Sequence, residues 1–341
     1  MRKKDENRSD HADEVSPMFR LRYSHYLAFS PDGKRVIAAK AGRIHELPSG
    51  EEIAKWKIPS NICFAAWSPD GKVVALQDTY GKIRICEATS GEQLAMLKMS
   101  FEGWPIRFRP DGRSLIGGDW NGKLFEWRTS DWTELNSVDI GESIELVSPG
   151  SSIVCVAVED TLIALDSSFQ KELWREPIGP NETYGVCMAG RSPVLYEWST
   201  KKRCMTKRTF GKGSREKRVS VKTEKSKCHL AEIEISPNGR IVCLLHDDEF
   251  VVMDSELKVL AQRKIKTGTR PNFSFDSSMV ALPSHYSGGE VWRIDDLIGR
   301  QKKQGATSNK TKLASQGFVQ MCRVITIRCT RSRGPRGFWK Q

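Results

Sequence analysis

The pentapeptide SPDGK occurs twice in the chain, at Ser30 to Lys34 and again at Ser68 to Lys72, 38 residues later. Both copies lie between short β-prone runs, which are YLAF and RVIAA around the first copy and CFAAW and VVALQ around the second. Proline presets the φ angle of the second turn position, aspartate can close an Asx turn, and glycine tolerates a positive φ. Each copy therefore predicts a β-hairpin with a tight reversal between its strands.

Related turns continue along the chain at a regular spacing. RPDGR begins at Arg109, SPGSS at Ser148, SPNGR at Ser236 and FDSSM at Phe275, which are 41, 39, 88 and 39 residues apart in turn. The interval of 88 residues equals two periods, and the missing turn falls in MAGRSPV, which lacks an Asp-Gly pair. Self-similarity at a fixed period marks a repeat architecture. We expect seven units over residues 23–295, with the fifth, at about 182–222, irregular.

The remainder of each unit also repeats. DTYGKIRICEATSGEQLAML in the second unit and DWNGKLFEWRTSDWTELNSV in the third each contain a Gly turn, an alternating strand, a second turn and an apolar strand. This pattern predicts four strands per unit, and no segment of the body shows a sustained helical period. The fold class is therefore expected to be all-β.

These units resemble the WD-repeat β-propeller family. The segment GKIRICEATSGE, Gly81 to Glu92, fits the family pattern, with Cys86 at the Trp position and Glu87 at the Asp position. In the other units, the Trp position is assigned to Leu47, Trp127, Leu165, Met253 and Ile294, and the Asp position to Pro48, Arg128, Asp166, Asp254 and Asp295. The resemblance implies a seven-bladed β-propeller in which every blade is a four-stranded antiparallel sheet.

A propeller ring also needs a strand that joins its last blade to its first, because open sheet edges invite wrong pairing. The seventh unit supplies only three strands before a polar segment. The fourth can come from Pro17 to Tyr23 (PMFRLRY) or from Phe318 to Cys329 (FVQMCRVITIRC). We expect the N-terminal segment, since its direct connection costs less loop-closure entropy.

The charge of the chain is concentrated outside the expected body. Residues 199–228 contain 12 Lys and Arg against 2 Glu, and residues 299–341 contain 11 Lys and Arg and no acid. The chain carries +12, so the rest of it carries −9. We expect a disordered N-terminal segment at 1–16, a propeller at 17–298 with a solvated basic insertion at 199–228, and a disordered basic tail at 299–341. Binding of nucleic acid by the basic segments is the less favoured alternative.

Composition and motifs exclude several classes of protein. The longest apolar runs are strand-sized, so no membrane span is expected, and the N-terminus lacks the apolar region of a secretory signal. The nine cysteines form no C-x-x-C pair and show no zinc-ligand spacing, which favours reduced thiols. We expect a cytoplasmic monomer without metal or cofactor.

Catalytic motifs are also missing from the sequence: it has no G-x-S-x-G, H-E-x-x-H or phosphate loop. The expectation is a non-enzymatic protein. The only suggestive cluster is His246 with Asp247 and Asp248. An enzyme or small-ligand sensor with a site in the central channel remains the alternative, and convergence of titratable side chains in one pocket would favour it.

Surface recognition is the function that these observations favour. In WD-repeat propellers, the turns between second and third strands and the links between blades lie on one face, which we call the first face. The resemblance places Tyr80, Trp120, His246 and Tyr286 in such turns, and Trp104 and Tyr184 on links. Exposed aromatic side chains are common interface anchors, although Trp104 and Trp120 can also fold back over the strand ends. We expect a protein or peptide partner to bind these six residues.

Overall fold

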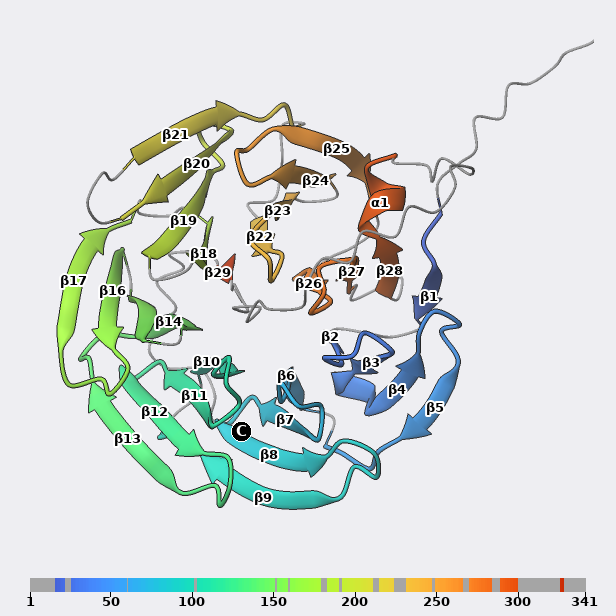
Figure 1. Ribbon diagram of the computed structural model, residues 1–341, viewed down its shortest axis with the longest axis vertical. Helices are drawn as coiled ribbons and strands as arrows, with labels where there is room; N and C mark the ends of the chain where they lie inside the picture. Colours follow the sequence, from blue (N-terminus) through green and yellow to red (C-terminus); the bar gives the residue numbers. More distant parts are fainter. Residues whose placement is uncertain are drawn as a thin grey trace, which may run out of the picture.

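Seven antiparallel β-sheets form a closed ring in the computed structural model (Figure 1). The described residues are 16–21, 26–59, 61–100, 103–150, 152–158, 160–178, 183–189, 192–210, 215–223, 231–246, 249–265, 270–283, 289–299 and 326–327. Each sheet is one blade, with its first strand at the centre of the ring and its last at the periphery. The predicted all-β seven-bladed propeller is therefore confirmed.

The blades follow one another in chain order. Blade 1 consists of β2 (Leu27–Phe29), β3 (Arg35–Ala38), β4 (Arg43–Glu46) and β5 (Glu52–Lys55), and blade 2 consists of β6 (Ile62–Trp67), β7 (Val73–Asp78), β8 (Lys82–Glu87) and β9 (Gln93–Lys98). Blade 3 consists of β10 (Gly103–Phe108), β11 (Ser114–Asp119), β12 (Lys123–Arg128) and β13 (Glu134–Asp139). Blade 4 consists of β14 (Ile144–Pro149), β15 (Ile153–Val158), β16 (Thr161–Asp166) and β17 (Glu172–Pro177). Blade 5 consists of β18 (Thr183–Ala189), β19 (Ser192–Ser199), β20 (Cys204–Thr209) and β21 (Arg215–Ser220). Blade 6 consists of β22 (Ala231–Ile235), β23 (Ile241–His246), β24 (Glu249–Asp254) and β25 (Val259–Lys264). Blade 7 consists of β26 (Asn272–Phe273), β27 (Met279–Leu282), β28 (Gly289–Arg293) and β1 (Phe19–Leu21). The remaining elements are short: η1 (Ala39–Ala41), α1 (Ile294–Leu297) and β29 (Thr326–Ile327), which pairs with the inner edge of β18.

The N-terminal strand closes the ring, as expected. β1 pairs antiparallel with β28, with Phe19 opposite Val291 and Leu21 opposite Gly289. Leu21 is buried in a cluster that includes Leu27 of blade 1 and Val291 of blade 7. The strand from one chain end therefore completes the last blade and fills the joint with the first.

The repeated turns between first and second strands have one common hydrogen-bond pattern. In the copy at Ser68, the Ser68 hydroxyl donates to Asp70 Oδ1 at 2.6 Å, the Lys72 amide donates to the same oxygen at 3.1 Å, and the Val73 amide donates to Ser68 Oγ at 3.1 Å. Three other turns repeat this arrangement, and their Ser and Asp or Asn pairs are Ser30 with Asp32, Ser236 with Asn238, and Ser274 with Asp276. The turn residues are thus bound to one another, as expected for a structural motif.

Blade 5 differs from the prediction in one way. The stretch 199–228 is no insertion over its described part, because it contains β20 and β21, the two outer strands of the blade. β21 is exposed and highly charged at the rim of the sheet, where charged side chains discourage pairing with other chains. Its four consecutive strands pair without a register shift, but β29 adds a fifth strand at the inner edge, so this sheet departs from the four-stranded pattern of the other six, in line with the irregular fifth unit that was expected. The missing Asp-Gly turn did not disturb the pairing of the four consecutive strands.

A register shift recurs between the third and fourth strands of other blades. It precedes His45, Cys86, Trp127, Leu165 and Met253 in blades 1, 2, 3, 4 and 6. The same five residues lie opposite the second strand at equivalent positions, and Trp292 takes this position in blade 7. The Trp position is therefore His45 rather than Leu47 in blade 1, and Trp292 rather than Ile294 in blade 7. Sequence spacing alone placed these two frames two residues too far along the chain.

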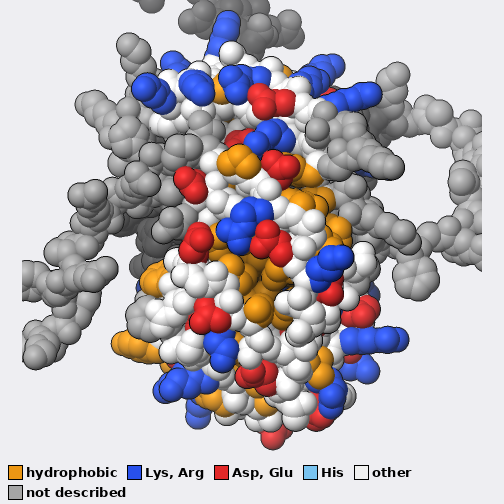
Figure 2. Space-filling model, turned by 90° about the vertical axis from the view of Figure 1, so that its left-hand side faces the viewer, with side chains coloured by type: hydrophobic (Ala, Val, Ile, Leu, Met, Phe, Trp, Pro, Cys, Tyr) orange, Lys and Arg blue, Asp and Glu red, His pale blue; other side chains and the backbone are white. Residues whose placement is uncertain are grey.

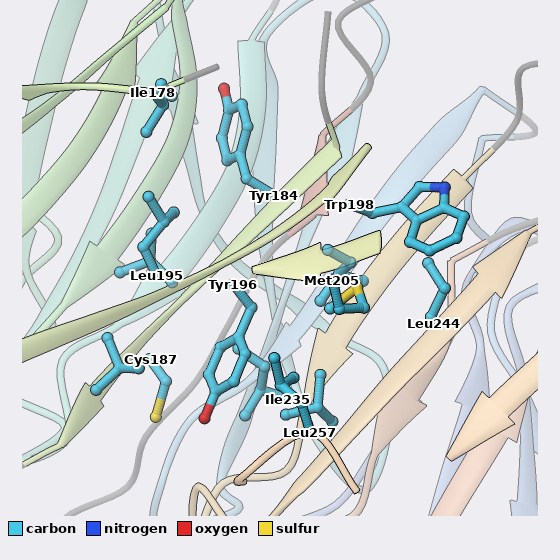
Figure 3. Packing of buried hydrophobic residues seen from close by; sticks show 14 of the residues in the cluster. Ile178, Tyr184, Cys187, Leu195, Tyr196, Trp198, Met205, Ile235, Leu244 and Leu257 are labelled. Carbon is cyan, nitrogen blue, oxygen red and sulfur yellow. The ribbon is translucent and has the colours of Figure 1, made fainter. Parts of the chain in front are cut away.

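The core consists of apolar clusters at the joints between blades. Figure 3 shows the cluster around blade 5, where Tyr184, Leu195, Trp198 and Met205 lie among residues of the neighbouring blades. Each of these four side chains is at most 2% exposed. Because every blade buries its two faces against its neighbours, the ring is stabilised as a whole rather than blade by blade.

Two kinds of turn between third and fourth strands fit these joints. Gly50 has a positive φ of 76°, and a side chain there would meet the ring of Phe19 at 2.7 Å. Gly91 stands in the same relation to the ring of Trp56, at 2.3 Å. In blades 3, 4 and 6, the turn instead carries an apolar residue with positive φ, namely Trp132, Phe169 and Leu257. Their side chains pack at the joint, so the turn itself supplies the apolar group.

The outer wall of the ring is mixed in character. Figure 2 shows the side occupied by β13, β17 and β21, where Lys and Arg alternate with Asp and Glu around a strip of hydrophobic side chains. Leu135 and Leu173, which are 39% and 42% exposed, belong to the outer strands β13 and β17.

Candidate functional site

Two of the six predicted partner-binding residues are displayed on the first face. Tyr80, in the turn between β7 and β8, is 67% exposed, and Trp120, in the turn between β11 and β12, is 37% exposed. The two turns occupy equivalent places in neighbouring blades. The structure therefore displays one aromatic side chain on each of the neighbouring blades 2 and 3. We call these two turns, with Lys82, Lys98 and Lys123 beside them, the aromatic site.

A buried aspartate holds each of these turns from below. Asp78 Oδ1 accepts hydrogen bonds from the amides of Tyr80 and Lys82, both at 2.9 Å. Asp119 Oδ1 accepts from the amides of Asn121 at 3.1 Å and Lys123 at 2.8 Å. Since both carboxylates are buried and committed to the backbone, they fix the turns without being displayed to a partner. The aromatic side chains are what these turns expose.

The other four predicted residues are placed differently. Tyr184 is 1% exposed in β18, and its hydroxyl donates to Glu145 Oε2 at 2.8 Å. His246 is 2% exposed at the end of β23, with its ring 5.3 Å from that of Trp198. Both were expected on the surface, and this expected exposure is wrong because their side chains belong to the core.

Trp104 does not lie on a link between blades but in β10, where it is opposite Gly118. Tyr286 lies outside the described residues, as do Asp247 and Asp248 of the suggested His-Asp-Asp cluster. Burial of His246 removes the one described member of that cluster from the solvent. The hypothesis of a channel site around it therefore has no exposed histidine to build on.

Sequence reasoning missed the charges that flank the aromatic site. Beside Tyr80, Lys82 and Lys98 lie directly opposite each other on β8 and β9, and both are exposed. The Met99 amide donates to the carbonyl of Gly81 at 2.9 Å, which places the end of β9 against the Tyr80 turn. The two lysines are 16 positions apart in the sequence, and only the strand register shows that they meet.

Beside Trp120 the charges are different. Lys123 lies opposite Asp139, an acid, on β12 and β13. A side chain at Gly122 would meet the backbone of Glu142 at 2.8 Å, so this second acid also adjoins the turn. Glu142 is paired with Arg175 at 4.0 Å, so the aromatic site has a basic side at blade 2 and a side of mixed charge at blade 3.

A buried ion pair lies in the body of blade 3. Arg109 Nε donates to Glu126 Oε1 at 2.6 Å, and the two side chains are 8% and 5% exposed. Burial would raise the pKa of Glu126, but hydrogen bonds from Arg109, Ser114 and Asn136 outweigh it and lower this pKa. Arg109 also donates to the carbonyls of Gly150 and Ser167 in blade 4. The hydrogen bonds of Arg109 join blade 3 to blade 4, and the ion pair therefore has the geometry of a group that stabilises the fold.

The mouth of the central channel away from the aromatic site holds a small cavity. Arg107 and Glu234 line it together with apolar and aromatic residues such as Phe29 and Phe273, and its volume is about 40 Å³. Pockets for small-molecule ligands usually measure about 300 to 1,000 Å³. This cavity offers room for a few waters at most.

A second set of titratable groups lies along the channel. Arg270 and Glu232 form an ion pair at 3.5 Å, and both side chains are largely buried. Burial raises the pKa of Tyr26, and the field of Cys63 adds to this effect while Arg270 opposes it. Charged groups are therefore present here, and Arg270 and Glu232 are paired with each other.

Within the described residues, no cluster of three or more His, Cys, Asp or Glu has a geometry that could hold a metal ion. No helix in the same part of the chain is long and apolar enough to cross a membrane.

Comparison with known proteins shows the fold alone. No family model matches the sequence, and no curated protein matches it either. Among solved structures, the chain is similar to Kuenenia stuttgartiensis hydrazine synthase, with a TM-score of 0.68 and 11% identity over 83% of this chain and 98% of that one. It is similar to the Myceliophteria thermophila Cps50 (Swd1) beta-propeller domain to the same degree, with a TM-score of 0.68 and 10% identity over 82% of this chain and 99% of that domain. Proteins of different kinds thus share this ring, and its function depends on the residues that it displays.

Proposed function

We propose that this chain is a non-enzymatic interaction module of the cytoplasm, a divergent WD-repeat propeller that binds a protein or peptide partner through the aromatic site. The observation that carries this proposal is the joint exposure of Tyr80 and Trp120 on neighbouring blades. Both turns are held by buried aspartates, so the two rings are presented from a rigid support. Rigid, exposed aromatic side chains are the usual anchors of protein interfaces.

The size of the channel cavity supports the same proposal. At about 40 Å³, the cavity beside Arg107 and Glu234 is too small for most substrates. The alternative, an enzyme or small-ligand sensor, needs a larger site in this channel. Membership of the WD-repeat family is supported by the recurring register shift before the Trp position and by Trp127 at that position.

The proposal is tested by changing the two aromatic residues together. The Tyr80→Ala/Trp120→Ala variant of the full chain is compared with the unchanged chain in an affinity pull-down followed by mass spectrometry. A partner that the unchanged chain captures should be lost from the variant, while circular dichroism and the thermal midpoint stay the same. Loss of a hot-spot aromatic typically costs about 2 kcal/mol or more of binding free energy.

A matched control uses apolar residues elsewhere on the same two blades. Leu94 and Leu135 are 51% and 39% exposed on the outer strands β9 and β13. The Leu94→Ala/Leu135→Ala variant should keep the partner. Equal loss from both double variants, or unfolding of the aromatic variant, would contradict the proposal.

A further inference from the structure

The charges around the aromatic site define what kind of partner it fits. Lys82 and Lys98 face each other across a strand pair, where like charges repel and destabilise the sheet. Among the residues that the structure describes, neither lysine forms an ion pair. Such a pair at the surface has an unfavourable interaction that a bound anion would convert into a favourable one.

Further lysines extend this basic side over blade 1. Lys40 lies in η1, which packs against β6 of blade 2, and it is exposed. Lys57 is exposed just beyond β5, next to Trp56, whose amide donates to the carbonyl of Gly42 at 2.7 Å. Over the described first-face ends of blades 1 and 2, the one acid is Asp78, which is buried beneath its turn. The field at Tyr80 is therefore positive.

The basic side ends at Trp120. Exposed Asp139 follows it on blade 3, with the neighbouring Glu142 in an ion pair with Arg175, and exposed Asp160 lies at the same face of blade 4. A nucleic acid continuing along this face would bring its phosphates against these carboxylates. A protein segment can instead place its acids at one end only, so the change of charge favours a peptide with a mixed sequence.

We propose that the aromatic site binds an acidic and apolar protein segment, whose carboxylates lie over Lys82 and Lys98 and whose apolar side chains contact Tyr80 and Trp120. This inference rests on the proposed function of the same site. It names the chemistry of the partner, which the aromatic residues alone leave open.

The test uses a phage library of random dodecapeptides selected on the immobilised full chain, with the best peptides then synthesised and their affinities measured. We expect selected peptides with a cluster of Asp or Glu beside aromatic or aliphatic residues. The Lys82→Gln/Lys98→Gln variant should bind them about tenfold more weakly, and the difference should shrink at high salt. The control variant Lys34→Gln/Lys72→Gln removes two exposed lysines from the opposite face of blades 1 and 2 and should bind normally.

The outcomes separate this inference from the proposed function. Peptides that depend on Tyr80 and Trp120 but are neutral or basic would overturn the acidic chemistry and leave the aromatic site standing. Peptides that do not depend on these two residues would overturn both. A fluorescent single-stranded oligouridine is measured in parallel, and loss of its binding in the Lys82→Gln/Lys98→Gln variant alone would replace the peptide with a nucleic acid.

Discussion

The turns on the two faces of the ring use aspartate in opposite ways. On the face away from the aromatic site, Asp70 lies in the turn itself and binds Ser68 and the Lys72 amide, so the turn is closed upon itself. On the first face, Asp78 and Asp119 lie beneath their turns and leave the apolar side chains above them exposed. The first arrangement recurs with nearly the same distances in four blades.

This difference separates structure from recognition. The closed turn recurs in four blades, so we assign it to the structure that all blades share, which is the antiparallel sheet. Tyr80 and Trp120 occupy equivalent turns but differ from each other in residue type and in the charges around them. Variation at a repeated and well-supported position is where a repeat protein can carry a specific surface.

The largest effect on stability is expected from Asp119→Ala. The buried carboxylate accepts hydrogen bonds from two amides and from Ser100, and its removal leaves these donors without their acceptor. We expect a loss of about 2 kcal/mol in the free energy of unfolding, together with weaker binding at Trp120. Urea denaturation measures the loss, and Glu134→Ala, on the exposed outer strand β13 of the same blade, is the control that should change little.

A smaller effect is expected from Asp70→Ala on the opposite face. The turn loses the acceptor for Ser68 and Lys72, which should cost about 1 kcal/mol because water can replace part of these bonds. Asp70→Asn should retain most of the stability, since blade 6 builds the same turn with Asn238. Partner binding should be unchanged, and a binding defect in Asp70→Ala with an intact fold would break the division between the faces.

The aspartates in the turns between first and second strands should also make the stability of the fold depend on pH. Burial opposes ionisation of Asp32, Asp70 and Asp276, but hydrogen bonds from the neighbouring serines and amides outweigh it, so the pKa of each is lowered below 3.8. Because the pKa of each aspartate is lower in the folded state than in the unfolded state, the stabilisation is complete at neutral pH. It is lost as the pH falls through the folded-state pKa. Changing all three to Asn should flatten the decline of the thermal midpoint in acid. An unchanged decline would show that other carboxyl groups cause it.

The smallest effect on stability is expected at the aromatic site itself. Tyr80→Ala and Trp120→Ala should each shift the free energy of unfolding by no more than about 0.5 kcal/mol, because both side chains are exposed and their turns are held from below. Chemical denaturation of the single variants measures this. A loss several times larger at Trp120 would mean that its ring packs on the strand ends as a structural group.

The turn chemistry of this chain was readable in the sequence, since Pro, Asp and Gly act locally. The spacing of the turns between Ser30 and Phe275 therefore predicted the number of blades and most of their hairpins. Features that depend on strand pairing were harder to predict from the sequence. The Trp position in blade 1 is His45, two residues before the predicted one, because a register shift precedes it. Charge was misleading at Arg215–Ser220, because an exposed outer strand and a solvated insertion have the same composition.

The site could be predicted only in part for a related reason. Tyr80 and Trp120 follow buried aspartates in a recognisable turn, whereas Tyr184 belongs to a strand whose boundaries the sequence leaves uncertain. His246 stands at a strand end, and a polar residue there can point in either direction. The opposition of Lys82 and Lys98 needs the register of two strands, which no local pattern provides.

The two kinds of joint limit how a ring of this type can change by gene duplication. A copy of blade 2 brings Gly91, which needs the indole of a residue like Trp56 from the blade before it. A copy of blade 3 brings Trp132, which would compete with that indole for one space. Only blades with the same kind of joint can therefore be exchanged or inserted without leaving a void or a clash. The order of the blades is thus inherited as a unit, and a recombination point is tolerated best where the joints on both sides match.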